Sequence, residues 1–275
     1  MKNKAEELKM RVMFCFLENP DSTVTGISRT LNEPKQTISR MLMALEKEGL
    51  INRENNRHPK LTSDGEYWAN LYNKRMNINL HYLMYNGVNI EDAREDAMYF
   101  ALHSSDATMK MIAKTTEILR IKSEPSMKRK FSGDWLCNNL SDGIYNFPFI
   151  IYKEIAKNGN NISMANRGFV HPCTITVKNG VGIVQLQAVA MSEKSSLNGE
   201  TMTGKVKNMR YFSYGEYIQA ETIGDLITFP ATALEFVTDG TGSEKILHGS
   251  VGVNMECSVG PEHMAEATAI FTVII

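Results

Sequence analysis

Residues 35–40, with the sequence KQTISR, bring together side chains that donate hydrogen bonds and include no acid. An amide and a guanidinium near the start of a helix are the groups that read adenine and guanine edges in the major groove of DNA. Lysine and hydroxyl side chains beside them suit the phosphate backbone. These residue types therefore indicate hydrogen bonding to double-stranded DNA.

The spacing of the apolar residues places these donors on one face of a helix. The positions i, i+4 and i+7 that should face the core are Ile38, Leu42 and Leu45. The opposite face then carries Lys35, Gln36, Ser39 and Arg40. Asn32 can cap this helix, and Pro34 suits its first turn, where a missing N–H costs nothing. A solvated polar helix in some other helical bundle is the alternative.

The neighbouring segments supply the rest of a known motif. A short helix ending near Leu31 comes before this helix, and Gly49 ends it. Residues 50–53 and 60–62 follow as two short strands around the loop 54–58. This order predicts a winged helix-turn-helix domain. The residues expected to contact DNA are Pro34, Lys35, Gln36, Thr37, Ser39, Arg40, Arg53, Arg57 and Lys60.

The composition is that of an ordinary globular protein. The 275 residues are 43% hydrophobic and 22% charged, enough for two domains that each bury a core. Residues 1–75 hold 13 Lys and Arg against 10 Asp and Glu, a basic bias that suits DNA contact. No run reaches the roughly 18 apolar residues of a membrane span, so we expect a cytoplasmic protein without a membrane partner. Four scattered cysteines indicate reduced thiols.

The chain changes character near residue 121. Before it the apolar spacing is helical, and after it short β-rich runs alternate with turn clusters such as KNGNN and TDGTGSE. We predict an α+β protein with four parts. These are a winged-helix domain at 1–75, a helical dimerisation region at 76–121, a polar linker at 122–133, and a mainly antiparallel β domain, sandwich or barrel, at 134–275.

Over roughly residues 5–121 the chain resembles the iron- and manganese-dependent repressors of the diphtheria toxin repressor type. The stretches that carry the resemblance are LNEPKQTISRMLMALEKEGLI, LTSDG after the wing, and LMYNGVNIEDAREDAMYFALHSSD. In that family the last stretch builds a two-fold dimer interface, which implies a homodimer and an inverted-repeat operator. The matching interface residues are Ala93, Ala97, Phe100 and Ala101. Packing within one chain explains the same stripe, and both interpretations stay open.

The metal ligands of that family are not matched here. In its register they fall at Leu8, Arg75, Asn79, Arg94, Met98, Ala101 and Leu102. A shift by one residue gains only His103. Divalent iron, manganese or zinc needs imidazole, carboxylate or thiolate ligands, so we expect no metal and no cofactor. One hypothesis is that Arg75 and Arg94 supply fixed positive charge and tie the wing domain to the dimer helix. The alternative is two solvated arginines.

The β domain shows no pattern that indicates catalysis, and we expect no enzyme. GETMTGKV, residues 199–206, has the spacing of a phosphate loop but lacks its Ser/Thr and its helix, so we expect a hairpin loop. Five residues could converge on a metal or reactive-thiol site, although their spacing does not support it: His171, Cys173, His248, Cys257 and His263. The aromatic run suits core packing, with a ligand platform as the alternative: Tyr211, Phe212, Tyr214 and Tyr217.

Together these features predict a dimeric, sequence-specific transcriptional regulator, a repressor by its resemblance, that has lost the metal response. Its β domain is large enough to bind a small-molecule effector or to add contacts. One rival is a regulator that binds metal through other ligands in the β domain. A second is an enzyme or small-molecule carrier whose helical domain only dimerises. The operator, the effector and the direction of regulation do not follow from these residues.

Overall fold

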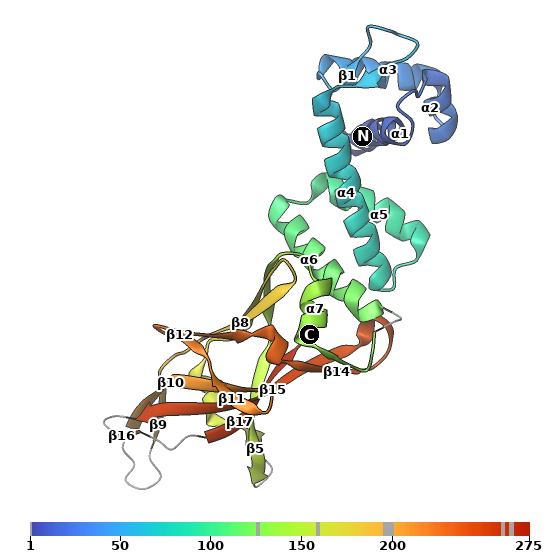
Figure 1. Cartoon of the computed structure of the whole chain (residues 1–275). Helices are drawn as coiled ribbons and strands as arrows, with labels where there is room; N and C mark the ends of the chain where they lie inside the picture. Colours follow the sequence, from blue (N-terminus) through green and yellow to red (C-terminus); the bar gives the residue numbers. More distant parts are fainter. Residues whose placement is uncertain (1, 125–126, 158–159, 195–200, 260–261, 264–266) are drawn as a thin grey trace. The chain divides into compact units, whose positions relative to one another are not determined.

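The chain folds into two compact units, residues 1–119 and 120–275. The structure is a computed structural model that describes residues 2–124, 127–157, 160–194, 201–259, 262–263 and 267–275. In Figure 1 the first unit is helical, coloured blue to green, and the second consists mainly of strands, coloured green to red. Helices followed by antiparallel strands confirm the predicted α+β fold.

The first unit consists of helices and one short wing. Its elements are α1 (Lys2–Glu18), α2 (Val24–Leu31), α3 (Lys35–Lys47), β1 (Ile51–Asn52), β2 (Lys60–Leu61), α4 (Ser63–Tyr85) and α5 (Ile90–His103). The last helix, α6 (Asp106–Ser123), begins in this unit and continues past its boundary. The helix-turn-helix is formed by α2 and α3, and the wing by β1 and β2.

One hydrophobic core joins α1, α2 and α3 to α4. Its fully buried side chains include Val12 and Met13 from α1, Ile27 from α2 and Ala69 from α4. The apolar face of α3 enters the same core. Burying a side chain such as Val or Ile contributes about 1.5–3 kcal/mol relative to leaving it exposed. The rotation of α3 about its own axis is therefore set by this core.

The start of α3 differs from the prediction. Asn32 does not cap it but ends α2, with φ 53° and ψ 42° in the left-handed region. Asparagine adopts this conformation more readily than other residues with a side chain, because its short polar side chain bonds locally. Pro34 directly precedes the first helical residue, Lys35. Asn32 therefore ends α2, and Pro34, not Asn32, precedes the first residue of α3.

Two of the predicted boundaries do not coincide with the ends of helices or strands. The single helix α4 runs through residues 75 and 76, where the winged-helix domain was expected to end, because the sequence there contains neither glycine nor proline. Of the predicted linker at 122–133, Lys122 and Ser123 end α6 and Lys130–Ser132 form a strand. Residues 125 and 126 lie outside the described residues.

The second unit contains two antiparallel sheets. Its first strands and helices are β3 (Lys130–Ser132), α7 (Gly133–Asn139), β4 (Gly143–Phe147), β5 (Phe149–Lys157), β6 (Asn160–Ile162), η1 (Met164–Gly168), β7 (Cys173–Lys178), β8 (Val181–Gln187) and β9 (Met191–Lys194). They are followed by β10 (Thr201–Ser213), β11 (Glu216–Gln219), β12 (Glu221–Ile223), β13 (Leu226–Pro230), η2 (Ala231–Ala233), β14 (Glu235–Asp239), η3 (Gly242–Glu244), β15 (Ile246–Val259), β16 (Glu262–His263) and β17 (Ala267–Ile274).

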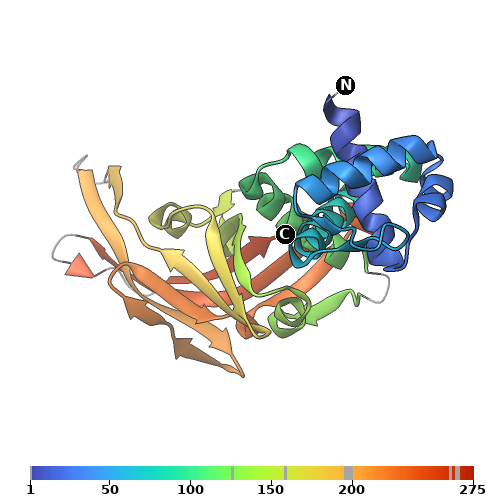
Figure 2. The same ribbon diagram turned by 90° about the horizontal axis from the view of Figure 1, so that it is seen from above.

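The larger sheet has the strand order β11-β10-β15-β17-β5-β6, with β3, β9, β14 and β16 attached at its sides, and the smaller has the order β12-β13-β8-β7-β4. Their inner faces meet at Phe229 of β13. This ring stacks on Tyr211 of β10 at 5.5 Å and meets Phe271 of β17 edge-on at 5.7 Å. Among the described residues the sheets pack as a sandwich rather than closing into one barrel (Figure 2).

The sequence predicts a hairpin loop for GETMTGKV, but the described part of this stretch is a strand. Residues 201–206 belong to β10, where they pair with β9 and β15, and residues 199–200 lie outside the described residues. Lys205, the lysine of the phosphate-loop spacing, pairs with Asp225 at 2.6 Å. The cluster TDGTGSE does form a turn, with Gly240 and Gly242 both at positive φ.

Two glycines at equivalent positions near helix starts test how closely α4 approaches the segment between α3 and β1. Gly26 and Gly65 each donate the N–H that a threonine cap accepts, three residues after Thr23 and Thr62. A Cβ at Gly65 would lie 2.0 Å from the Leu50 carbonyl oxygen, whereas one at Gly26 would meet only the Thr23 hydroxyl at 3.5 Å.

We predict that Gly65→Ala lowers the free energy of unfolding by about 1–3 kcal/mol. In contrast, Gly26→Ala should raise it by about 0.4–1 kcal/mol, because alanine restricts the unfolded chain. Urea unfolding of the full chain measures both effects. Equal changes in the two variants would contradict the close backbone approach at Gly65.

Candidate nucleic-acid interface

Helix α3 separates an apolar face from a donor face, as its spacing predicts. Ile38, Leu42 and Leu45 are all 0% exposed. The residues exposed on the other side include Lys35, Gln36 and Arg40, while Thr37 and Ser39 are half-buried. Among the described residues, none forms a hydrogen bond or ion pair with the side chains of Lys35, Gln36 or Arg40. These three groups are therefore available to a ligand.

The turn before α3 directs its first residues outward. The Ser28 hydroxyl donates to the Glu33 carbonyl oxygen at 2.6 Å, and the Glu33 N–H donates to the Ser28 carbonyl oxygen at 3.0 Å. Exposed Pro34 follows, and no side chain caps α3. The first N–H groups of a helix lack partners within the helix and suit a phosphate. The first turn of α3 thus offers backbone donors beside the side-chain donors.

The wing adds two exposed cations. β1 and β2 pair antiparallel, with Ile51 opposite Leu61. Arg57, in the loop between them, and Lys60, on β2, are exposed. The Asn55 side-chain oxygen accepts from the Arg57 backbone N–H at 3.1 Å and shapes the loop. The wing therefore presents positive charge from a defined turn.

Arg53 differs from the other predicted contact residues. Its guanidinium pairs with Glu46 of α3 at 3.3 Å, and only 13% of its side chain is exposed. Its Nε is buried without a partner among the described residues. The Arg53 ion pair thus connects the wing to the last turn of α3. No local sequence pattern predicted this contact.

The alanine stripe of α5 lies inside the first unit. Ala93, Ala97 and Ala101 are each 0% exposed, and Ala93 and Ala97 form a small core with Leu83 of α4. Packing within one chain therefore accounts for these three alanines, and the dimer interface stays a prediction. Small side chains let α5 approach α4 closely. Phe100 packs against the same small core and is half-buried.

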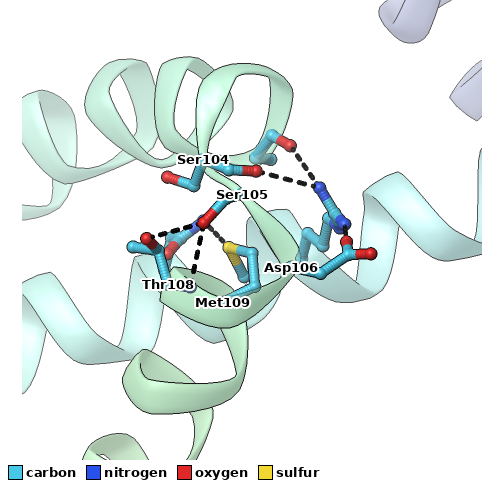
Figure 3. Close-up of polar contacts among 8 residues, drawn as sticks. Ser104, Ser105, Asp106, Thr108 and Met109 are labelled. Carbon is cyan, nitrogen blue, oxygen red and sulfur yellow. Dashed lines mark hydrogen bonds and ion pairs between the residues drawn. The ribbon is translucent and has the colours of Figure 1, made fainter.

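Arg75 joins α4 to the turn between α5 and α6. It donates to the carbonyl oxygens of Ala101 at 3.5 Å and Ser104 at 3.3 Å, and it pairs with the Asp106 carboxylate. Figure 3 shows Ser104 and Asp106 in this turn. Carbonyl groups at the end of a helix carry partial negative charge, which a guanidinium complements. Only 15% of the Arg75 side chain is exposed, so it is not simply solvated.

Arg94 does not share these contacts. It is exposed on α5 and lines a cleft of about 520 Å³ together with Arg11, Met76 and Met98. The two arginines of the hypothesis therefore have different surroundings. Arg75 ties the helix that follows the wing to the end of α5, whereas Arg94 faces solvent.

The other positions of the family's metal register hold no ligand set. Asn79 is 0% exposed, and its side-chain amide donates to the Met109 sulfur at 3.5 Å. Its Oδ1 has no partner among the described residues. Leu8 and Leu102 pack against the core of the first unit. Within the described ranges, no three His, Cys, Asp or Glu side chains gather as a metal site.

The His and Cys candidates of the second unit are structural where they are described. The His171 ring stacks on Phe149 at 3.9 Å, and its Nε2 lies 2.9 Å from the Asn166 carbonyl oxygen. The Cys173 thiol donates to the Phe147 carbonyl oxygen at 3.3 Å. Burial raises the pKa of Cys173 to about 12, so the thiol is uncharged at neutral pH. His248 is half-buried on β15, and the side chains of Cys257 and His263 lie outside the described residues.

The aromatic run of β10 and β11 is only partly a core feature. Tyr211 is buried against Phe229, as core packing predicts. Phe212, Tyr214 and Tyr217 are 45%, 94% and 37% exposed. Alternation along a strand turns successive side chains to opposite faces of the sheet, and Tyr214 lies at the hairpin turn, with φ 50°.

None of the helices that the structure describes is long and apolar enough to cross a membrane. No protein-family model matches the chain, and no curated protein matches it. Among solved structures, the manganese regulator SloR is similar at 13% identity and a TM-score of 0.36, covering 82% of this chain and 97% of that one. IdeR from T. acidophilum is similar at 16% identity and a TM-score of 0.34, covering 72% and 91%.

A third similar structure is the NEAT5 domain of IsdX2, a B. anthracis hemophore in complex with heme. It shares 15% identity at a TM-score of 0.29, covering 48% of this chain and 96% of that one. All three TM-scores lie below 0.5, so these likenesses carry no argument about this chain.

The contacts of Arg75 give a further prediction. We expect Arg75→Met to lower the free energy of unfolding of the first unit by about 1.5–3 kcal/mol, because hydrogen bonds to a charged donor are lost. Arg94→Met, at an exposed position on α5, is the matched control and should change it by no more than about 0.5 kcal/mol. Thermal unfolding compares the two. If Arg94→Met lowered the free energy of unfolding as much as Arg75→Met, the contacts of Arg75 would not explain its effect.

Proposed function

We propose that this protein is a dimeric, sequence-specific regulator of transcription that binds double-stranded DNA through α3 and the wing. The observation that carries the proposal is the donor face of α3, where Lys35, Gln36 and Arg40 are exposed without partners while the opposite face is fully buried. An amide and a guanidinium on a helix of this kind suit the base edges of the major groove. The protein then acts in the cytoplasm by binding rather than by catalysis.

The proposed contacts fall into two groups. Gln36 and Arg40 read bases, and Lys35, Thr37 and Ser39 hold phosphate together with the first turn of α3 after Pro34. Arg57 and Lys60 of the wing contact the backbone, which carries no sequence information directly. Arg53 is left out of the contact set because its guanidinium is mostly covered and paired with Glu46.

A homodimer fits the proposed function because two copies of α3 on a two-fold axis reach successive major grooves about 34 Å apart. The operator is then an inverted repeat. Since the alanines of α5 are buried within the chain, the partner has to meet other side chains of α5 and α6. Tyr99 and Met111 are 52% and 55% exposed on these helices, and we propose that they contribute to the interface.

We also propose that DNA binding does not depend on a divalent metal. In the register of the metal-dependent repressors, the positions of the ligands hold side chains such as Arg75 and Asn79. Arg75 places a fixed positive charge against the carbonyl groups that end α5. A guanidinium stays charged at every physiological pH, so the connection between α4 and α5 is always present.

The base-reading contact is tested with an operator selected from random-sequence DNA by the full-length protein. Arg40→Ala should cost about 1–3 kcal/mol of binding free energy and relax the preference at one base pair of each half-site. Lys178→Ala, at an exposed lysine of β7 in the second unit, is the control. Unchanged affinity in the Arg40→Ala variant would contradict the proposed contact.

The wing contact has a different signature from the α3 contact. Arg57→Ala should weaken binding to all sequences alike and reduce the slope of log affinity against log salt by about 1. Electrophoretic mobility shifts at several salt concentrations measure both quantities. A change of base preference without a change in slope would show that Arg57 reads bases instead.

Metal independence predicts that operator affinity is the same in excess chelator and in chelator-treated protein supplied with manganese or iron. Fluorescence anisotropy of labelled operator measures this directly. If DNA binding is lost in chelator and restored by either metal, the protein uses metal through ligands outside the register of the family.

A further inference from the structure

The first unit contains a cleft of about 620 Å³. It is lined by α1, by the end of α3, by α4 and by the last turn of α5. Volumes of this size are typical of sites that hold small molecules. The DNA contacts proposed above do not use this cleft.

One wall of the cleft is aromatic. Trp68 and Tyr72, one turn apart on α4, stack with ring centroids 5.9 Å apart and an interplanar angle of 27°. Trp68 is 41% exposed, which is unusual for so large an apolar ring on a folded helix. The floor consists of the apolar side chains of Met10, Leu50 and Leu102. A flat apolar ring therefore meets aromatic and apolar side chains in this cleft.

Besides Tyr72, the polar side chains that line the cleft are Glu6, Glu48, Lys9 and His103. Lys9 pairs with Glu48 and lies 3.7 Å from Glu6, so one ammonium group serves two carboxylates. The side chains of Glu6 and Glu48 remain 56% and 46% exposed. This group of three carries one net negative charge. A cation near an indole ring is attracted by its face as well as by the carboxylates.

We propose that this cleft binds a planar aromatic cation and that the bound cation is an effector of DNA binding. The ring packs against Trp68, and the positive group lies against the exposed sides of Glu6 and Glu48, away from the Lys9 ammonium that they share. Glu48 is the residue directly after α3, and Leu102 belongs to the last turn of α5. An occupant thus contacts both the end of the recognition helix and the helix that Arg75 anchors. The effector part rests on the proposed function, whereas the binding part does not.

Trp68 serves as its own reporter. The chain has two tryptophans, Trp68 and Trp135, and Trp135 belongs to α7 in the second unit, beside Phe131. In the full-length Trp135→Phe variant, benzamidine is the cationic probe and benzamide its neutral isostere. Benzamidine should change Trp68 emission saturably, and benzamide should bind at least about fivefold more weakly.

Two glutamates at the C-terminal end of α3, Glu46 in its last turn and Glu48 directly after it, provide matched variants. Glu48 and Glu46 are each 46% exposed and each paired with one basic side chain, but only Glu48 lines the cleft. In the Trp135→Phe background, Glu48→Gln should weaken benzamidine binding about fivefold or more, because the net negative charge is lost, and Glu46→Gln should leave it unchanged. Circular dichroism of both variants confirms that the fold is retained.

The outcomes separate the two parts of the proposal. The binding part is overturned by Trp68 emission that does not saturate, by equal binding of benzamidine and benzamide, or by equal effects of the two glutamine variants. If benzamidine binds but leaves operator affinity within about twofold of its value without the probe, a shift of less than 0.5 kcal/mol, the effector part is overturned. If the protein binds no DNA at all, the proposed function fails while the binding result stands.

Discussion

The burial of one face of α3 is the constraint on which the proposed function depends. Ile38, Leu42 and Leu45 can enter the core shared with α1 and α4 only if the helix turns its other side to solvent. That side carries the donors, so the same packing that stabilises the domain also aims Lys35, Gln36 and Arg40 outward. A core of this kind is rigid because its side chains are close-packed. The donor face of α3 thus inherits its geometry from the core.

The second constraint is electrostatic and lies at Arg75. Three acceptors from the end of α5 and the start of α6 converge on one guanidinium that is mostly covered. A divalent metal in this region would draw helices together through ligand bonds and would respond to metal supply. A guanidinium offers a similar positive charge that is permanent. The Arg75 contact therefore does not depend on the concentration of a metal, so a regulatory ligand would have to act at another site.

The cleft that we propose as the effector site combines the end of α3 with the last turn of α5 in its lining. These are the two elements that the packing core and the Arg75 contacts hold in place. The indole of Trp68 stacks on Tyr72, whose ring lies 5.7 Å from the Arg75 guanidinium, so the cleft adjoins the Arg75 contacts. The sandwich of the second unit is a separate structure with its own core around Phe229.

The sequence by itself determined the features that depend on neighbours within a few residues. The order of the elements, the apolar face of α3, the wing and the β-rich second half all follow from local periodicity and turn residues, and all are present in the structure. Asn32 shows the limit of such reasoning, because two adjacent helices compete for one capping residue. Only the tertiary structure showed which helix packs against the alanine stripe, because small residues permit close approach to any helix and do not specify which one.

Tertiary structure also decided the roles of the arginines. Arg75 meets acceptors 26 to 31 residues later in the chain, and Arg53 meets Glu46 across the end of α3. The type of a charged residue does not reveal whether its partner is water, a carboxylate or a helix end. The partner of a charged side chain depends on which segments the core brings together. The arrangement of these segments is stabilised by burial of apolar side chains over the whole unit.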